Sequence, residues 1–493
     1  MILFNGGEFL INYRKVLKSI GSLLIIEAAC MVPSMLVSLF YKEKAVYSFA
    51  ISIVITAIAG FILYRLKAPN QNIYARDGFA ITALGWLSVT VFGALPFLIS
   101  GSIPSVIDAF FETASGFTTT GASILREVES LPKGILFWRS FTHWMGGMGV
   151  LVLMIAVLPS TKANAVYIMK AEASGPSPDK LVPKIRQTAE ILYIIYTAIT
   201  FIIIVLLLLG GMPLFDSIAH AMGTVSTGGF SVRNASIAAY NSVYIETVII
   251  LSMLISGINF TLYYFLLKKN VKGFLKNEEL LYYIGVIAVA IVLIVANIYG
   301  KVYSTIGESL RYASFQVSSL ITTTGYVTAD FNQWPTLSQM VLLLIMFIGG
   351  CAGSTAGGIK CIRILLLSKM FKREITKLNH PRAVKTVRIN GHAVDEEILS
   401  GIKMFFFVYV AIFAAGVLVI SLEGFDLPTT ISAVVATLND IGPGLGLVGP
   451  VGNYADFSVL SKVVLSICMM IGRLEVYPIL VLLFPSFWKK NTI

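Results

Sequence analysis

Charged residues are scarce in this chain of 493 residues, because Asp, Glu, Lys and Arg together make up only 13% of it. Soluble domains carry about 25% charged residues, so a soluble globular protein is excluded. The chain also has only four cysteines and four histidines. Their spacing matches neither a disulfide framework nor a zinc motif, which argues against a secreted disulfide scaffold and against a metalloenzyme.

Apolar residues are abundant instead, at 56% of the chain with a mean hydropathy of +0.83. A membrane-spanning helix needs about 20 predominantly apolar residues. Runs long enough to span occur at 19–41, 46–64, 78–100, 135–159, 189–211, 242–267, 279–299, 337–367, 400–421 and 458–487. Shorter, less apolar stretches at 104–118, 213–226, 306–322 and 427–439 are better interpreted as re-entrant helices. We therefore predict an all-α polytopic membrane protein.

The net charge of +11 could indicate a nucleic-acid partner, but the basic residues are distributed unevenly. The two termini and every second connection hold 26 Lys and Arg residues, whereas the alternate connections hold seven. Cytoplasmic loops of membrane proteins collect Lys and Arg. The pattern predicts that both termini are cytoplasmic and that no nucleic acid is bound.

Four short segments of the sequence resemble one another. They are 115–122 (SGFTTTGA), 223–230 (GTVSTGGF), 319–326 (SLITTTGY) and 436–443 (ATLNDIGP). We take Gly121, Gly228, Gly325 and Gly442 as their shared glycines, with spacings of 107, 97 and 117 residues. Each glycine follows a predicted short helix and precedes a long apolar run. The pattern indicates four pseudo-symmetric repeats of span, short helix, loop and span.

Such loops suit the binding of a bare cation. Irregular backbone at membrane depth is tolerated only where protein buries it or where it lines a water-filled cavity. Glycine reaches positive φ freely, so successive carbonyls can turn toward a common axis and replace the hydration shell of an ion. The alternative is ordinary Thr-Gly turn chemistry. The fourth segment lacks the threonines of the others and would make the ring less symmetric.

With these segments the chain resembles the Trk/Ktr/HKT superfamily of potassium transporters, TrkH type, from about residue 77 to the end. The resemblance implies a two-span domain at 1–70 and pore repeats at 77–160, 188–270, 277–370 and 398–488 around one central pore. It also implies potassium-binding filter positions at Thr119, Thr120, Gly121, Ser226, Thr227, Gly228, Thr323, Thr324, Gly325, Asp440, Ile441 and Gly442. A glycine at Gly121 is what potassium-selective relatives carry, whereas a serine there often accompanies sodium transport.

Residues 349–358 contain five glycines: Gly349, Gly350, Gly353, Gly357 and Gly358. Each glycine costs about 1 kcal/mol in a helix interior, so this stretch should interrupt the predicted span. A phosphate-binding loop would need the GxxxxGK[ST] pattern, which is absent. Close packing of small residues between helices is another alternative. The resemblance favours an intramembrane gating loop beneath the filter.

Arg473 lies within the last apolar run. An ionisable residue inside a membrane is costly and marks a candidate functional site. The resemblance places it in the permeation path beside the gating loop, where its charge would oppose the passage of a cation. The alternative is a structural ion pair with Glu475 or another buried carboxylate.

Other polar residues lie near the predicted outer face. Arg139, His143 and Trp144 begin a span and are interpreted as interfacial anchors. Four acidic residues near the short helices could enrich cations at the pore mouth or could serve only as caps and ion-pair partners; they are Asp108, Glu112, Asp216 and Glu308.

These features together predict potassium uptake through a channel-like pore in a bacterial plasma membrane. The transported ion needs no covalent chemistry, so we expect neither an enzyme nor a cofactor. A secondary symporter coupled to protons or sodium is the alternative, because its broken helices would also produce glycine-rich interruptions. The resemblance implies a homodimer and a cytosolic nucleotide-binding regulator of the TrkA type, which would dock on the basic loops 160–190 and 369–390.

Overall fold

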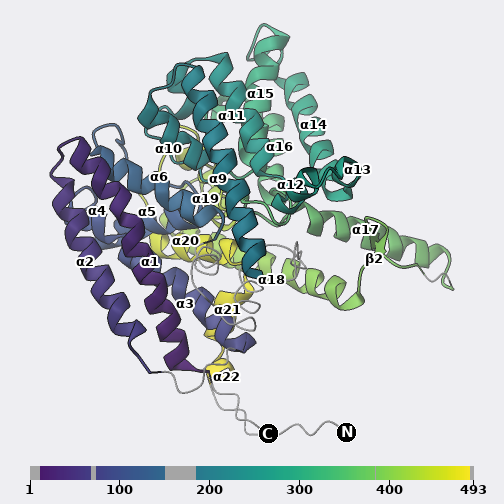
Figure 1. Ribbon diagram of the computed structural model, residues 1–493. Coiled ribbons are helices and arrows are strands. Elements are labelled where there is room, and N and C mark those ends of the chain that lie inside the picture. Colours follow the sequence, from purple (N-terminus) through teal and green to yellow (C-terminus); the bar gives the residue numbers. More distant parts are fainter. Residues whose placement is uncertain (1–10, 68–73, 150–184, 383–384, 489–493) are drawn as a thin grey trace, which may run out of the picture.

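The computed structural model describes residues 11–67, 74–149, 185–382 and 385–488, and it is mostly helical, as predicted (Figure 1). Helices α1 (Tyr13–Phe40) and α2 (Ala45–Tyr64) lie side by side along one flank. Their backbones approach closely, since a Cβ atom on Gly21 would lie 2.7 Å from the carbonyl oxygen of Gly60. Small residues permit this kind of contact between helices.

The remaining helices fill the rest of the molecule. In chain order they are α3 (Ala75–Gly93), α4 (Leu95–Ile99), α5 (Val106–Thr118), α6 (Lys133–Gly147), α9 (Ile185–Leu209), α10 (Leu214–Val225), α11 (Val243–Ser256), α12 (Phe260–Leu267), α13 (Val271–Leu275), α14 (Glu278–Ile298), α15 (Ile306–Ile321), α16 (Thr336–Ile348), α17 (Cys361–Asn379), α18 (Glu396–Ile420), α19 (Leu427–Leu438), α20 (Val459–Arg473), α21 (Tyr477–Leu483) and α22 (Pro485–Trp488). Short 3₁₀ helices are η1 (Ser236–Tyr240), η2 (Phe331–Gln333), η3 (Ser421–Glu423) and η4 (Gly446–Val448).

Within the described residues, six helical stretches are long and apolar enough to span a membrane: α1, α2, α3 with α4, α9, α14 and α18. The pair α11 and α12 passes the same test but bends by 93° between them. The outer faces are apolar; on α2, for example, Val54, Ile58 and Ile62 are more than half exposed. Extended apolar surface of this kind marks contact with lipid or protein rather than water.

Several of the predicted spans are not single helices in the described residues; the run 242–267, for example, is the bent pair α11 and α12. The run 337–367 breaks after Ile348, where the glycines begin, and the run 458–487 breaks where Glu475 and Val476 take positive φ values of 54° and 73°. Helix α6 ends at Gly147, and residues 150–159 of that predicted span lie outside the described residues. Hydropathy detects apolar length but not these local backbone reversals.

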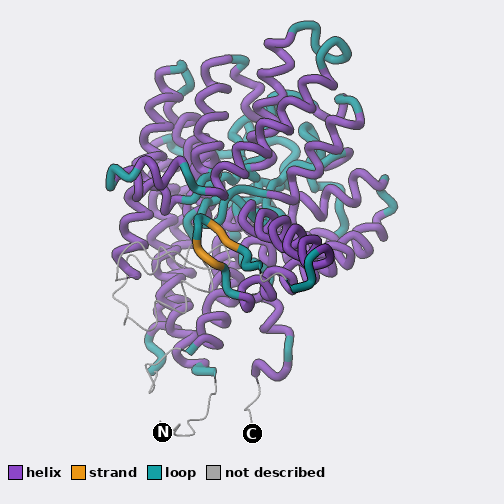
Figure 2. The backbone as a smooth tube through the Cα atoms, turned by 90° about the vertical axis from the view of Figure 1, so that its right-hand side faces the viewer, coloured by secondary structure: helices purple, strands orange, loops and turns teal. Residues whose placement is uncertain are grey.

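Four short helices, α5, α10, α15 and α19, occupy the stretches predicted for them at 104–118, 213–226, 306–322 and 427–439. Figure 2 shows that much of the non-helical chain gathers in the middle of the molecule, among the helices. The first and last parts of the chain pack together there. One buried apolar cluster joins side chains of α1, α3, α5 and α6 to others from α19 and α20.

A two-stranded antiparallel hairpin, β1 (Arg388–Ile389) and β2 (His392–Ala393), lies between α17 and α18 in the sequence (Figure 2). Its turn residues Asn390 and Gly391 both have positive φ, as expected for the Asn-Gly turns that close tight hairpins. The amide of Asn390 donates to a carboxylate oxygen of Glu278 at 2.8 Å. The hairpin is therefore tied to the start of α14.

Candidate functional site

Each of the four short helices ends in the same unusual turn. The first residue with a left-handed backbone is Thr119, Thr227, Thr323 or Asp440, with φ of 60°, 55°, 54° and 54°. Two residues later a glycine also has positive φ: Gly121, Gly229, Gly325 or Gly442, at 81°, 79°, 79° and 94°. Non-glycine residues rarely adopt such values and do so mostly at functional sites. The four segments therefore share one backbone conformation.

The hydrogen bonds of the four turns are also the same. The amide after each left-handed residue donates to a carbonyl five residues earlier: Thr120 to Ser115 at 2.9 Å, Gly228 to Gly223, Thr324 to Ser319 and Ile441 to Ala436, each at 2.8 Å. This is the bond of a Schellman helix cap. It ends each helix abruptly, so the partial negative charge of the helix C-terminus lies directly beside the turn.

The structure corrects the register of the second segment. Gly229, not Gly228, has the positive φ that corresponds to Gly121, and the spacings become 108 and 96 residues. Gly228 takes the place of Thr120. Ser226 lies one residue before the left-handed Thr227, and its hydroxyl donates to the carbonyl of Met222 at 2.7 Å. The eight-residue segments already contain the signal, since Gly229 is the seventh residue of 223–230 as Gly121 is of 115–122.

The four turns touch one another in a closed ring. A Cβ atom built on each glycine would lie far too close to a carbonyl oxygen of the next segment: Gly121 to Gly228 at 2.2 Å, Gly229 to Thr324 at 1.7 Å, Gly325 to Ile441 at 2.1 Å, and Gly442 to Thr120 at 2.8 Å. The last contact returns from the fourth segment to the first. Only glycine fits at these positions, because any side chain would push two segments apart.

The ring carries carbonyl groups without hydrogen-bond partners. Among the residues that the structure describes, no amide or side chain donates to the carbonyl oxygens of Thr119, Thr120, Thr227, Gly228, Thr323, Thr324, Asp440 and Ile441. Buried carbonyls normally have hydrogen-bond partners. Unpaired carbonyl oxygens gathered in one ring are the ligands that replace the hydration shell of a bare alkali cation. The arrangement is suited to holding a bare cation.

Asp440 brings the only carboxylate to the left-handed position of the four turns. Its side chain is fully buried, and Oδ1 accepts a hydrogen bond from the hydroxyl of Thr120 at 3.0 Å. Within the described part of the chain, Oδ2 has no partner. A buried carboxylate oxygen without a donor is costly unless a cation compensates it. Arg473 and Lys360 are the cationic groups that act electrostatically on it.

A cavity of about 200 Å³ lies on the side of the ring from which the chain continues after each glycine. It is lined by all four ring glycines, Gly121, Gly229, Gly325 and Gly442, and by residues that follow them, among them Ala122, Phe230, Val327 and Pro443. Three arginines also line it: Arg126, Arg139 and Arg233. The cavity therefore leads onto the glycine end of the ring.

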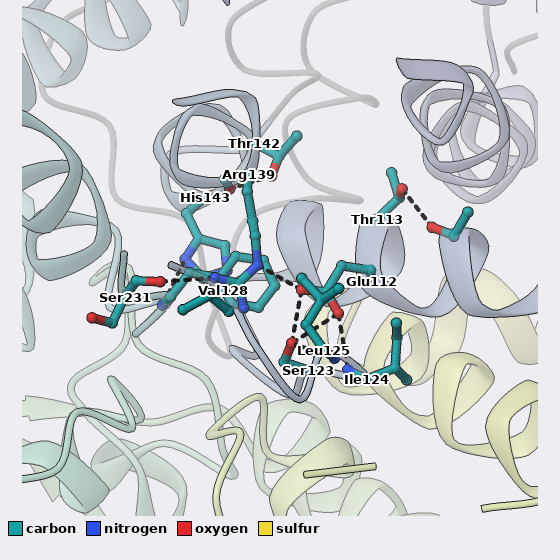
Figure 3. A network of polar contacts seen from close by, with 12 residues as sticks. Glu112, Thr113, Ser123, Ile124, Leu125, Val128, Arg139, Thr142, His143 and Ser231 are labelled. Carbon is teal, nitrogen blue, oxygen red and sulfur yellow. Dashed lines mark hydrogen bonds and ion pairs between the residues drawn. The ribbon is translucent and has the colours of Figure 1, made fainter. Parts of the chain in front are cut away.

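Each of these arginines is paired with a carboxylate. Figure 3 shows Arg139 between Glu112 and Ser231; Nε lies 2.6 Å from Oε1 of Glu112, and Nη1 donates to the carbonyl of Ser231 at 2.9 Å. Glu112 also accepts from the amide of Ile124 at 3.0 Å. This network links the first segment to the second on the cavity side of the ring.

The other predicted acids also have partners. Asp216 lies 3.0 Å from Arg233, and Asp108 accepts from Lys462 at 2.7 Å, while the exposed Arg126 contacts Asp456. Glu308 accepts a hydrogen bond from the Thr305 hydroxyl at 3.0 Å at the start of α15. Ion pairing and helix capping are the second of the two roles expected for these acids.

The interpretation of Arg139 and His143 as interfacial anchors is wrong, because both are buried. The His143 ring stacks on Phe230 with ring centroids 4.0 Å apart. Its Nδ1 accepts from the Phe230 amide at 3.4 Å. Both residues pack against neighbouring segments, and hydropathy cannot reveal such contacts.

Residues 349–360 form a non-helical loop between α16 and α17, as the five glycines predict; we call it the glycine loop. Its first half is held at the bend between α11 and α12. The amide of Cys351 donates to Gly257 and the amide of Phe260 donates to Gly353, both at 2.9 Å. A carboxylate oxygen of Glu279 accepts from the amide of Ala352 at 2.6 Å.

The second half of the glycine loop lies against the helix-end side of the ring, opposite the cavity. The hydroxyl of Thr355 donates to the carbonyl of Val225 at 3.0 Å, and the amide of Gly357 donates to the hydroxyl of Thr323 at 2.7 Å. A Cβ atom on Gly357 would lie 2.3 Å from the carbonyl oxygen of Asn439. A glycine is required here because the loop approaches the fourth segment so closely.

The other predicted glycines determine the backbone path of the glycine loop. Gly349, Gly353 and Gly358 have positive φ of 73°, 70° and 78°. A Cβ atom on Gly350 would lie 2.7 Å from that of Ala356, so the two halves of the loop fold against each other.

Arg473, at the end of α20, reaches the glycine loop. Nη1 donates to the carbonyl of Thr355 at 2.9 Å, and Nη2 donates to the carbonyl of Gly147 in α6 at 2.6 Å. Glu475 forms an ion pair with Arg363. Arg473 therefore bridges the loop to a helix of the first segment.

Sequence reasoning did not place Lys360 at this site. Lys360 is buried, has a positive φ of 79° and donates from Nζ to the carbonyl of Ala356 within the loop. A lysine inside the apolar run 337–367 was the available signal, because such residues are rare in spans unless they have a role.

Residues 45–490 match the sequence model of the TrkH family, described as a cation transport protein. This chain belongs to the TrkH family. It is similar to the Trk system potassium uptake protein TrkH of Salmonella typhimurium, with 38% identity over 487 residues covering 97% of this chain and 100% of the relative. It is equally similar, at 38% over 484 residues with the same coverage, to TrkH of Escherichia coli K12.

The structure agrees with this assignment. The fold matches the crystal structure of the potassium transporter TrkH from Vibrio parahaemolyticus with a TM-score of 0.88 and 36% sequence identity, covering 97% of this chain and 100% of the other. The predicted membership of the superfamily and the predicted helical polytopic fold are therefore confirmed. As a TrkH family member, the chain has the overall architecture of a membrane transporter.

Proposed function

We propose that this chain conducts potassium into the cell through one central pore, whose selectivity filter is the ring of four segments. In this proposal, four repeats at 77–160, 188–270, 277–370 and 398–488 surround the pore, and the two spans of residues 1–70 pack outside it. The closed ring of contacts among Gly121, Gly229, Gly325 and Gly442 supports it most strongly. The names of the similar proteins, potassium uptake proteins and a potassium transporter, supply the ion.

Ions would move from the cavity onto the glycine end of the ring and lose water there. The unpaired carbonyls replace the hydration shell. The four short helices direct their negative C-terminal ends at the same point, each equivalent to roughly half an elementary charge. When ionised, the buried carboxylate of Asp440 would add a negative charge at the helix-end side of the ring.

The glycine loop would act as the gate on the far side of the ring. It is attached to the third and fourth segments through Thr323 and Asn439 and to α6 through Arg473. The guanidinium of Arg473 repels a cation leaving the filter, and this repulsion is strong where water is excluded. We interpret the observed arrangement as closed, with Gly349, Gly350, Gly353, Gly357 and Gly358 giving the loop freedom to move.

The proposal also places the chain in a membrane and in a larger assembly. The distribution of Lys and Arg supports a multi-pass protein of the bacterial inner membrane with both termini in the cytoplasm. The designation "Trk system" of the relatives supports a multi-component assembly, for which we propose a homodimer and a cytosolic nucleotide-binding regulator of the TrkA type. On this chain, the docking surface for the regulator would include exposed basic residues of α17 and the following turn, such as Lys372 and Arg382. The other proposed docking loop, 160–190, lies mostly outside the described residues.

Flux measurements on the purified full chain in liposomes test the proposal. Potassium and rubidium should enter readily, and sodium and lithium should enter at least about tenfold more slowly, because the ring offers ligands at one fixed spacing. Equal sodium and potassium flux would refute the selective filter. Potassium flux that requires an imposed proton or sodium gradient would favour the coupled symporter over the channel-like pore.

A further inference from the structure

The side chains at the left-handed position of the four turns do not have equivalent partners. The Thr119 hydroxyl donates to the carbonyl of Thr118 and the Thr227 hydroxyl to the carbonyl of Ser226, each at 2.6 Å. Both of these bonds remain within their own segment. They fix the local turn but reach nothing else.

Thr323 has a different partner. Its hydroxyl oxygen accepts a hydrogen bond from the amide of Gly357 in the glycine loop at 2.7 Å, and both groups are buried. Asp440, at the same position of the fourth segment, also faces this glycine, since a Cβ atom on Gly357 would lie 3.0 Å from the Asp440 Cβ. The glycine loop thus contacts two adjacent segments of the ring, each at its left-handed residue.

We infer that Thr323 couples the conformation of the filter to the position of the glycine loop. The inference rests on the proposed function, in which the ring is the filter and the loop is the gate. While the loop lies beneath the ring, the Gly357 amide holds the third segment in the observed conformation. Withdrawal of the loop breaks this bond, and the Thr323 side chain can then turn so that its hydroxyl donates within its own segment, as those of Thr119 and Thr227 do.

Such a coupling acts in both directions. If loop withdrawal changes the affinity of the filter for potassium, then bound potassium must shift the loop equilibrium by the same factor. Thr323 is therefore a positioning residue, which acts on the ion through the backbone of its segment. Removal of its oxygen should change both the basal flux and the dependence of flux on potassium concentration.

The test compares Thr323→Val with Thr90→Val in the full chain reconstituted in liposomes, with rubidium as the transported ion. Valine keeps the shape of threonine and removes the hydroxyl. One buried hydrogen bond lost from the closed state should raise the basal flux about two- to tenfold in Thr323→Val. It should also shift the potassium concentration that half-saturates flux. Thr90→Val should leave both close to wild type, because Thr90 lies in α3 outside the ring and its buried hydroxyl donates only to the carbonyl of Trp86, at 2.8 Å. Thr323→Ser, which keeps the hydroxyl, should restore wild-type behaviour.

Equal effects of the two valine substitutions would overturn the coupling, as would an unchanged half-saturating concentration in Thr323→Val. Arg473→Ala is measured in parallel. If Arg473→Ala raises flux but Thr323→Val does not, the coupling is wrong and the gate stands; if neither raises flux, the proposed gate itself is wrong. If the Thr323→Val protein does not fold, Thr323→Ala is compared with Thr90→Ala by the same criteria.

Discussion

The carbonyl oxygen of Thr120 lies 2.8 Å from the point that a Cβ atom on Gly442 would occupy. This contact joins the first of the four segments to the last and closes the ring. The three other contacts follow the order of the chain, so each segment touches the next through one glycine and one carbonyl. A single substitution at any ring glycine should therefore disturb two segments together.

Gly121→Ala should abolish potassium selectivity. The new methyl group would lie 2.2 Å from the carbonyl oxygen of Gly228 and force the first two segments apart. We expect the ratio of potassium to sodium flux in liposomes to fall at least about tenfold, because the carbonyl spacing would no longer match one ion.

The control for this substitution is Gly101→Ala. Gly101 also has positive φ, at 70°, but nothing lies within 4 Å of its Cβ position. It should lose about 1 kcal/mol of stability from the backbone conformation alone and keep its selectivity. A selective Gly121→Ala protein would contradict the ring as a filter.

Asp440→Asn should weaken potassium transport while preserving the fold. Asparagine can still accept the hydrogen bond from Thr120, but it cannot carry the negative charge that Asp440 would present to a cation in the ring. Even 10 Å from an ion, at an effective dielectric constant of about 20, one charge contributes roughly 1.7 kcal/mol. We expect the half-saturating potassium concentration for flux to rise about tenfold. An unchanged value in a protein of normal thermal stability would show that the carboxylate does not act on the ion.

Arg473→Ala should increase cation flux. The substitution removes the bonds to Thr355 and Gly147 that hold the glycine loop, and it removes a positive charge from the exit of the filter. Bonds to a charged donor contribute about 1.5–3 kcal/mol each, so basal rubidium flux should rise at least about tenfold. Arg473→Lys should give an intermediate value, because a single ammonium cannot reach both carbonyls with the fork geometry of arginine.

Arg373→Ala is the matched control for the gate. Arg373 is buried in α17, forms an ion pair with Glu396 and lies 3.2 Å from Glu374, so its bonds do not involve the glycine loop. Its loss should lower thermal stability without increasing flux. A flux increase equal to that of Arg473→Ala would indicate general loosening of the region rather than release of a gate.

Two of the three arginine pairs at the cavity should differ strongly in their effect on stability. The Arg126 and Asp456 side chains are 69% and 70% exposed, so Arg126→Met should cost no more than about 1 kcal/mol. Arg139 and Glu112 are buried, and Arg139→Met would leave an uncompensated carboxylate at a cost of about 3–5 kcal/mol.

Thermal unfolding in detergent measures this difference, and the double variant Arg139→Met with Glu112→Leu should recover part of the loss. Similar unfolding temperatures for Arg126→Met and Arg139→Met would show that the buried pair is not a structural tie.

Much of the fold follows from local sequence. Apolar length located the long helices, and the shorter, less apolar stretches located α5, α10, α15 and α19. The five glycines from Gly349 to Gly358 marked a break in the helix, because glycine disfavours helix wherever it occurs. These features depend on residues close together in the chain, so a single sequence is enough to predict them.

Other features of the site could not be read locally. Two consecutive glycines, Gly228 and Gly229, are equivalent by residue type, and only the backbone conformation shows which one joins the ring. Arg139 resembles an interfacial anchor until the fold places Glu112 and Ser231 beside it. The contact of the Lys360 side chain with the carbonyl of Ala356 likewise appears only when the glycine loop is folded.

The sequence by itself determined a helical membrane chain of the TrkH family with four related glycine-bearing segments and one glycine-rich interruption. Those properties are set by composition, hydropathy and local backbone preference. The tertiary structure alone decided that the segments close into a ring through Gly442 and Thr120, and that Thr323, unlike Thr119 and Thr227, bonds to the glycine loop. Both depend on contacts between residues far apart in the chain, which form only when the helices pack and bring their ends together.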